Sequence, residues 1–101
     1  MIEQVRRLRT ELPGPGSVAL AGRRRAAVSG AVAVGNELYI ERGEGAILVD
    51  VDGNQLVDLG SGIAVASVGH AAPSVVAAVS GQAARFEHTC FMVTPYEGYV
   101  D

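Results

Sequence analysis

Hydrophobic residues recur every three or four positions at the start of the chain, a spacing that places one apolar stripe along a helix. These residues are Ile2, Val5, Leu8 and Leu12. Residues 13–16 then read Pro-Gly-Pro-Gly, and both residue types end helices. The pattern predicts an N-terminal helix over residues 1–12. Residues 17–36 are small and lack a clear period, so we expect an irregular connection there.

From residue 38 onward the period changes to two, which is typical of β-strands. Three short runs of β-favouring residues occupy 38–40, 46–51 and 55–59. The dipeptide Asp52-Gly53 between the last two runs favours the positive φ angles of a tight hairpin. The pattern therefore predicts a three-stranded antiparallel sheet, with 46–51 as its most buried strand.

A second helix is predicted to begin at Pro73, because proline suits the first helical position. Its expected buried face is formed by Val75, Val76, Val79, Ala83 and Phe86. Gly81 lies inside this helix and suggests a close contact with another backbone. Thr94 and Glu97 have the spacing of a capping box, in which each side chain bonds the backbone N–H of the other residue.

These elements suggest two parts of unequal size. Residues 1–93 are expected to form one unit that includes the linking helix. Residues 94–101 are expected to begin a helix that the chain leaves truncated, because barely two turns remain after the capping box. The apolar fraction is 49%, but it consists mostly of Ala and Val, and aromatic residues make up only 5%. We therefore expect this segment to need packing partners outside itself.

Charge and residue types exclude several functions. The formal net charge of −3 provides no electrostatic reason to bind nucleic acid or an acidic membrane. No apolar run approaches the roughly 18 residues of a membrane span. Cys90 is the only cysteine, and the two histidines lack metal-ligand spacing, so no metal site is expected. A reducing, cytoplasmic location follows from this cysteine usage.

All eight basic residues are arginine. A Schiff base to an aldehyde cofactor needs a lysine amine, so these residues do not supply one. Gly60-Ser61-Gly62 lacks the third glycine of a nucleotide-binding loop, and Ser61 lacks the context of a nucleophile. The glycines instead indicate that the backbone passes close to a bulky group. His70 is expected to form a hydrogen bond near the turn before the helix that begins at Pro73, and Cys90 to be a small buried apolar residue.

Two segments of the chain have the residue types of a pocket wall. The glycine-flanked turn leads directly to Ile63, and a second small apolar segment covers residues 89–92. Together they are expected to form one wall of an apolar pocket.

The run DVDGNQLVDLGSGIAVASVGHAAPSVVAAV resembles the N-terminal region of class III pyridoxal-phosphate aminotransferases. That family carries D-x-x-G-x-x-x-x-D, a turn of small residues, and then G-H-x-x-P before a helix. The matching positions are Asp50, Gly53, Asp58, Gly69, His70 and Pro73. The segment F-x-H-T-C-F, residues 86–91, narrows the resemblance to the bacterial branch that acts on 4-aminobutyrate and related ω-amino acids.

The resemblance implies an α+β fragment from the small-domain side of a fold type I transferase, which is α/β overall. The fragment comprises an N-terminal helix, the three-stranded sheet and the linking helix into the large domain. It also implies transfer of the amino group of 4-aminobutyrate to 2-oxoglutarate. Pyridoxal 5'-phosphate would be bound mainly by residues beyond this segment, in a homodimer or homotetramer.

The resemblance assigns no catalytic, cofactor-binding or metal-binding residue to this stretch. Its implied substrate-binding residues are Gly62, Ile63 and Met92. Met92 departs from the pattern, because many 4-aminobutyrate enzymes have glutamine there. Two alternatives stay open. One is a stand-alone, non-catalytic interaction module, and the other is a class III aminotransferase of the ornithine or acetylornithine type.

Overall fold

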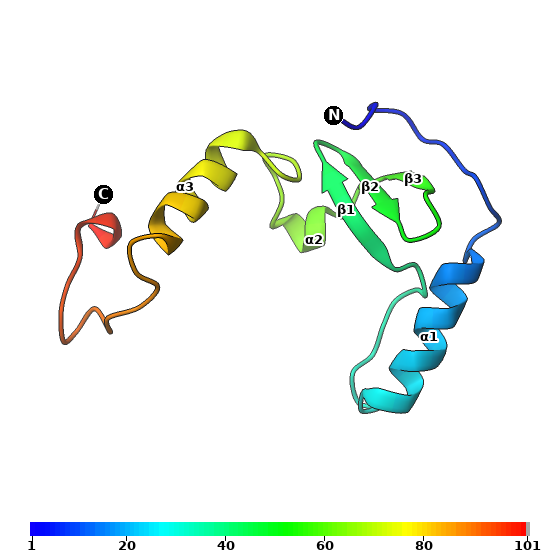
Figure 1. Ribbon diagram of the computed structural model, residues 1–101, viewed down its shortest axis with the longest axis horizontal. Coiled ribbons are helices and arrows are strands. Elements are labelled where there is room, and N and C mark those ends of the chain that lie inside the picture. Colours follow the sequence, from blue (N-terminus) through cyan, green and yellow to red (C-terminus); the bar gives the residue numbers. More distant parts are fainter. Residues whose placement is uncertain (101) are drawn as a thin grey trace.

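A three-stranded antiparallel sheet lies at the centre of the N-terminal sixty residues (Figure 1). In this computed structural model, which describes residues 1–100, the strands are β1 (Ile40–Glu44), β2 (Ile47–Asp50) and β3 (Gln55–Val57). Their order is β1-β2-β3, so the predicted meander is confirmed. Gly53 has φ of 80° in the hairpin between β2 and β3, as its dipeptide predicts.

The middle strand supplies most of the small core. Ile47 and Val49 of β2 are 1% and 4% exposed, and Asp50 at its end is fully buried. The prediction that this run is the most buried is therefore confirmed. Ala21 completes the set of buried apolar residues among residues 1–100. This core is small for the length of chain that it orders.

The predicted helix over residues 1–12 is wrong. This segment is extended, and Arg7 pairs with Gln55 of β3 in an antiparallel bridge. The Arg7 N–H donates to the Gln55 carbonyl over 3.0 Å, and the Gln55 N–H donates to the Arg7 carbonyl over 2.7 Å. A helix of twelve residues is marginal in water, so pairing with the free edge of β3 decides the outcome.

The first helix is instead α1 (Pro15–Ala27), within the region that was expected to be irregular. Proline stands at its start, and its free N–H groups are satisfied by a distant carboxylate. Asp52, in the β2–β3 hairpin, accepts from the N–H of Gly16 over 2.6 Å and from that of Ser17 over 2.9 Å. Because this cap lies 35 positions along the chain from Ser17, no local pattern predicts it.

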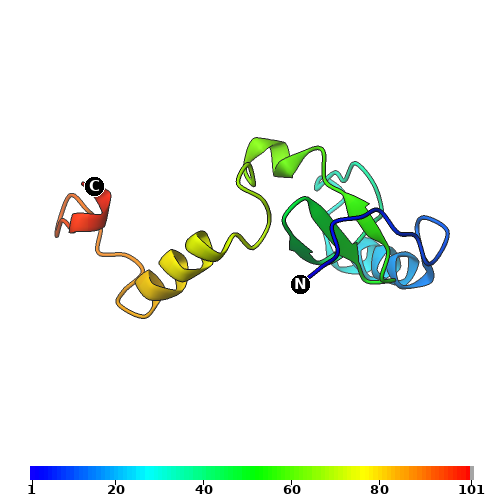
Figure 2. The same ribbon diagram turned by 90° about the horizontal axis from the view of Figure 1, so that it is seen from above.

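Beyond β3 the chain forms an arm that extends away from the sheet (Figures 1 and 2). It contains the short turn α2 (Ser61–Ala64), the helix α3 (Pro73–Ala83) and the 3₁₀-helix η1 (Glu97–Tyr99). The radius of gyration is 17.6 Å, against about 13 Å for a compact domain of 100 residues. The arm therefore contributes little to the core around β2.

Helix α3 begins at Pro73 as predicted, but its apolar face is not buried by residues 1–100. Val75, Val76 and Val79 are 48%, 49% and 63% exposed. The predicted close contact at Gly81 is also missing, since no described atom lies within 4 Å of the position that a Cβ would take there. Helical periodicity identifies an apolar face correctly, but it does not identify what covers that face.

The predicted capping box at Thr94 and Glu97 does not form among residues 1–100. The cap of η1 is Tyr96, without a side-chain bond, and the Thr94 carbonyl accepts from the Thr89 hydroxyl over 2.7 Å. Aromatic packing organises this segment instead, with the rings of Phe86 and Tyr96 edge-to-face at 5.3 Å. The division at residue 94 stays a prediction, and Asp101 lies outside the described residues.

The described part of the chain contains neither a membrane-spanning helix nor a cluster of metal-binding side chains. None of its helices combines the length and hydrophobicity needed to cross a bilayer. Within the same residues, no three His, Cys, Asp or Glu side chains come together in a way that would hold a metal ion.

Candidate functional site

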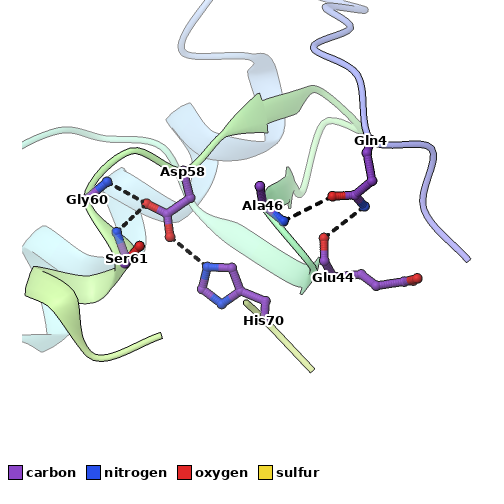
Figure 3. Close-up of polar contacts among 7 residues, drawn as sticks. All are labelled: Gln4, Glu44, Ala46, Asp58, Gly60, Ser61 and His70. Carbon is purple, nitrogen blue, oxygen red and sulfur yellow. Dashed lines mark hydrogen bonds and ion pairs between the residues drawn. The ribbon is translucent and has the colours of Figure 1, made fainter. Parts of the chain in front are cut away.

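A hydrogen bond between the side chains of Asp58 and His70 joins the end of β3 to the segment before α3 (Figure 3). The His70 Nε2 atom lies 2.6 Å from Oδ2 of Asp58. The other carboxylate oxygen, Oδ1, accepts from the N–H of Gly60 over 3.0 Å and from that of Ser61 over 2.8 Å. The Asp58 side chain is 12% exposed and that of His70 is 26% exposed. The expectation that His70, near the turn before α3, forms a hydrogen bond is confirmed.

The hydrogen bonds to Asp58 favour its charged form. The His70 imidazole has the largest effect, and together with the N–H groups of Ser61 and Gly60 it holds the pKa of Asp58 below its ordinary value. Burial opposes this shift but does not cancel it. Both carboxylate oxygens are engaged, so Asp58 holds neighbouring groups in place.

The backbone of His70 is fixed independently of its side chain. Its N–H donates to the Gly45 carbonyl over 2.8 Å, and its carbonyl accepts from the Gly45 N–H over 2.9 Å. Gly69, with φ of 90°, brings the chain into this bridge. A Cβ on Gly69 would lie 3.1 Å from the Gly45 Cα, so a side chain there would push the two backbones apart.

A second set of bonds ties the same region to the N-terminal segment (Figure 3). The Gln4 amide accepts from the N–H of Ala46 and donates to the carbonyl of Glu44, both over 3.0 Å. The carbonyl of Ala46 in turn accepts from the N–H of Asp58 over 2.9 Å. The turn between β1 and β2 therefore holds the backbones of both Asp58 and His70 through hydrogen bonds.

The turn α2 is left-handed. Its four residues Ser61, Gly62, Ile63 and Ala64 have φ angles of 47°, 61°, 62° and 63°. For the three that are not glycine, this conformation costs about 1–2 kcal/mol each. Strained backbone of this kind concentrates at binding and catalytic sites, where the surrounding structure has to maintain it.

The predicted substrate-binding residues are placed in two separate regions. Gly62 and Ile63 lie on α2, and the Ile63 side chain is 95% exposed. Met92, 92% exposed, lies in the segment after α3, which is distant from α2 in both views (Figures 1 and 2). The predicted pocket wall built from both segments is therefore not assembled by residues 1–100. Cys90, expected to be buried, is only partly buried.

Sequence reasoning missed the role of Asp58, which it treated only as one landmark of a resemblance. A local signal was present, because an aspartate often accepts from the N–H groups two and three positions later. No local sequence signal indicates the hydrogen bond between Asp58 and His70. It depends on the bridge between Gly45 and His70, which joins residues 25 positions apart.

The side chains on and after α2 do not fit a covalently bound aldehyde cofactor. Ile63, Val65 and Val68 are 95%, 83% and 74% exposed, so the accessible surface here is apolar. All basic residues of the chain are arginine, and none provides the amine that a Schiff base requires. This surface is suited to contact a hydrocarbon portion of a ligand.

Comparisons with known proteins identify the family to which this chain is related. Residues 29–101 match the family described as aminotransferase class-III. Over 99 residues, or 98% of this chain and 22% of the relative, the sequence is 60% identical to the 4-aminobutyrate aminotransferase of Mycobacterium tuberculosis. It is 42% identical to the 5-aminovalerate aminotransferase DavT of Pseudomonas putida over 82 residues, which cover 81% of this chain and 19% of that protein. The chain thus spans about a fifth of the length of these relatives.

Solved structures show the same relationship. An omega-transaminase from Sphaerobacter thermophilus matches with a TM-score of 0.75 and 27% identity, over 88% of this chain and 21% of that one. The ornithine aminotransferase of Toxoplasma gondii matches with a TM-score of 0.62 and 33% identity, over 68% of this chain and 16% of that one. The α+β arrangement of α1, the sheet and α3 is therefore that of a segment of the aminotransferase fold. Since the family match covers most of its residues, the chain belongs to the class III aminotransferases.

Proposed function

We propose that this chain is a segment of a pyridoxal-phosphate-dependent aminotransferase that transfers the amino group of 4-aminobutyrate, or a related ω-amino acid, to 2-oxoglutarate. The observation that carries the proposal is the placement of Ile63. A strained left-handed turn, anchored by Asp58, presents this apolar side chain with 95% of its surface exposed. The names of the related proteins support an ω-amino acid as the amino donor.

The proposed role of the turn is to contact the methylene chain of the donor. Ile63 provides the apolar contact, and Gly62 lets the backbone approach the substrate because it has no side chain. A difference of one methylene group in such a contact is worth about 1–3 kcal/mol, or 10–200-fold in specificity. Met92, which lies apart from α2 within residues 1–100, is proposed as a separate contact to the substrate from the segment after α3.

The cofactor itself is assigned to residues outside this segment, since these 101 residues contain no lysine. The segment's task is to shape and dry one side of the substrate site. The proposed assembly is a homodimer or homotetramer, and the proposed location is the cytoplasm. Membership of the family supports the proposed assembly, and the single cysteine, Cys90, supports a reducing compartment.

A chimeric holoenzyme tests the proposal. Residues of this chain replace the 99 aligned residues of the mycobacterial relative, and the parent enzyme is the control. With 2-oxoglutarate as acceptor, kcat/KM is measured for 4-aminobutyrate, 5-aminovalerate and ornithine. We expect 4-aminobutyrate to be the best donor. A chimera that folds and binds the cofactor, but prefers ornithine or uses none of the three, would refute the proposed function.

A further inference from the structure

We infer that Asp58 and His70 are positioning residues that hold the turn α2 so that Ile63 sets the length of the amino donor that the enzyme accepts. The inference rests on the proposed function, because it takes Ile63 as a substrate contact. It assigns Asp58 and His70 a role that acts through the turn and does not require contact with the substrate.

The two oxygens of Asp58 have separate tasks. Oδ1 holds the start of the turn through the N–H groups of Gly60 and Ser61, at 3.0 and 2.8 Å. Oδ2 is bound by the His70 imidazole at 2.6 Å. The second bond fixes the rotation of the carboxylate, and this rotation determines where Oδ1 points. His70 therefore acts on the turn through Asp58.

The backbones of Asp58 and His70 are themselves held in place by hydrogen bonds. The backbone of His70 is bonded to Gly45 in both directions, at 2.8 and 2.9 Å, and the N–H of Asp58 is bonded to Ala46 at 2.9 Å. Gly45 and Ala46 are neighbours in the turn between β1 and β2. The backbones of Asp58 and His70 are thus both hydrogen-bonded to the turn between β1 and β2. This turn sets the distance between their side chains.

Apolar packing does not hold the turn within the described residues. Leu59 and Ile63 are 92% and 95% exposed, and Val65 is 83% exposed. Three residues of the turn nevertheless keep a left-handed conformation that they disfavour. Within residues 1–100, the side-chain hydrogen bonds that connect this turn to the end of β3 are those that Asp58 accepts from Gly60 and Ser61.

The experiment uses the chimeric holoenzyme described above and measures the ratio of kcat/KM for 4-aminobutyrate to kcat/KM for 5-aminovalerate. Loosening the turn should admit the longer donor. We expect Asp58→Ala and His70→Leu each to lower the ratio about tenfold, the discrimination that one methylene contact provides. His70→Gln keeps a donor on the side chain and should restore most of the ratio.

Asp52 provides the matched control. Its carboxylate also accepts two backbone N–H bonds, from Gly16 and Ser17, but it anchors α1. Asp52→Ala should lower thermal stability without changing the ratio. An equal change of the ratio in Asp52→Ala and Asp58→Ala would show a general structural effect and overturn the inference. If Asp58→Ala does not fold, His70→Leu gives the same comparison, because it leaves Asp58 in place.

A double-mutant cycle with Ile63→Ala separates the inference from the proposed function. If Asp58 acts through Ile63, then Asp58→Ala should not change the ratio further in the Ile63→Ala background. A ratio that Ile63→Ala itself leaves unchanged would refute the proposed substrate contact. If Ile63→Ala lowers the ratio while Asp58→Ala and His70→Leu do not, the inference alone fails.

Discussion

The side-chain amide of Asn54 donates a hydrogen bond to the Asp50 carboxylate over 2.8 Å, and neither residue is exposed to solvent. The carbonyl oxygen of the same amide accepts from the N–H groups of Arg9 and Thr10, over 2.7 and 3.0 Å. One buried side chain therefore connects the β2–β3 hairpin to the N-terminal segment, which packs at the edge of the sheet without forming a helix.

Removing this amide should release the N-terminal segment. Asn54→Ala leaves Oδ2 of Asp50 and the N–H groups of Arg9 and Thr10 without their partner, at about 1–3 kcal/mol for each buried group that stays unsatisfied. Native-state hydrogen exchange of the Arg7 and Gln55 amides in the chimeric enzyme measures this local opening. Asn36→Ala, at an exposed asparagine, is the control and should change it by less than about 0.5 kcal/mol. Equal effects of the two substitutions would contradict the role of Asn54.

Two glycines of the turn should respond differently to the same substitution. Gly62 has φ of 61°, so Gly62→Ala should destabilise the turn by about 1–2 kcal/mol. Gly60 has φ of −96°, where alanine is comfortable, so Gly60→Ala should be neutral or slightly stabilising. The nearest atom to a Cβ on Gly62 is 3.9 Å away, so any loss reports conformation and not a clash. Exchange rates of the turn amides measure both effects, and a neutral Gly62→Ala would argue against a left-handed turn.

The lowered pKa of Asp58 predicts a pH dependence of the turn. Because the folded-state pKa lies below the ordinary value of 3.8, the unfolded state binds more protons in this range and stability rises with pH. The contribution of Asp58 should be complete above about pH 5 and be lost as the pH falls through the folded-state pKa. Amide exchange at Gly60 and Ser61, corrected for intrinsic rates, should show this loss of protection. The Asp58→Asn variant should lack it, and identical profiles would contradict the prediction.

Met92 tests the second part of the proposed substrate site. Met92→Gln introduces an amide that can hydrogen-bond a donor carboxylate, so kcat/KM for 4-aminobutyrate should rise about two- to tenfold, the effect of one net hydrogen bond. The side chain is 92% exposed, so stability should stay within about 0.5 kcal/mol. Val93→Gln, at a neighbour that is 75% exposed, is the control and should leave kcat/KM unchanged. No change in Met92→Gln would remove Met92 from the site.

Local patterns in the sequence determined the sheet and the start of α3. The β-favouring run over residues 46–51 and the Asp52-Gly53 dipeptide specify a hairpin, because strand propensity and turn conformation depend on neighbouring residues. Pro73 marks a helix start for the same reason, since its fixed φ and missing N–H act within one turn. The motifs around Asp58, His70 and Pro73 also identified the family, which the comparisons confirmed.

Tertiary contacts alone determined the conformation of the N-terminal third and the pairing of Asp58 with His70. The stripe from Ile2 to Leu12 indicated a helix, but the unpaired edge of β3 offered that backbone better partners. A carboxylate from the hairpin accepts the first N–H groups of α1, and Asp58, which accepts the N–H of Ser61 at the start of α2, is paired with His70. In each case the deciding hydrogen bonds join residues far apart in the chain. Periodicity and propensity describe neighbouring residues only, so they contain no information about such bonds.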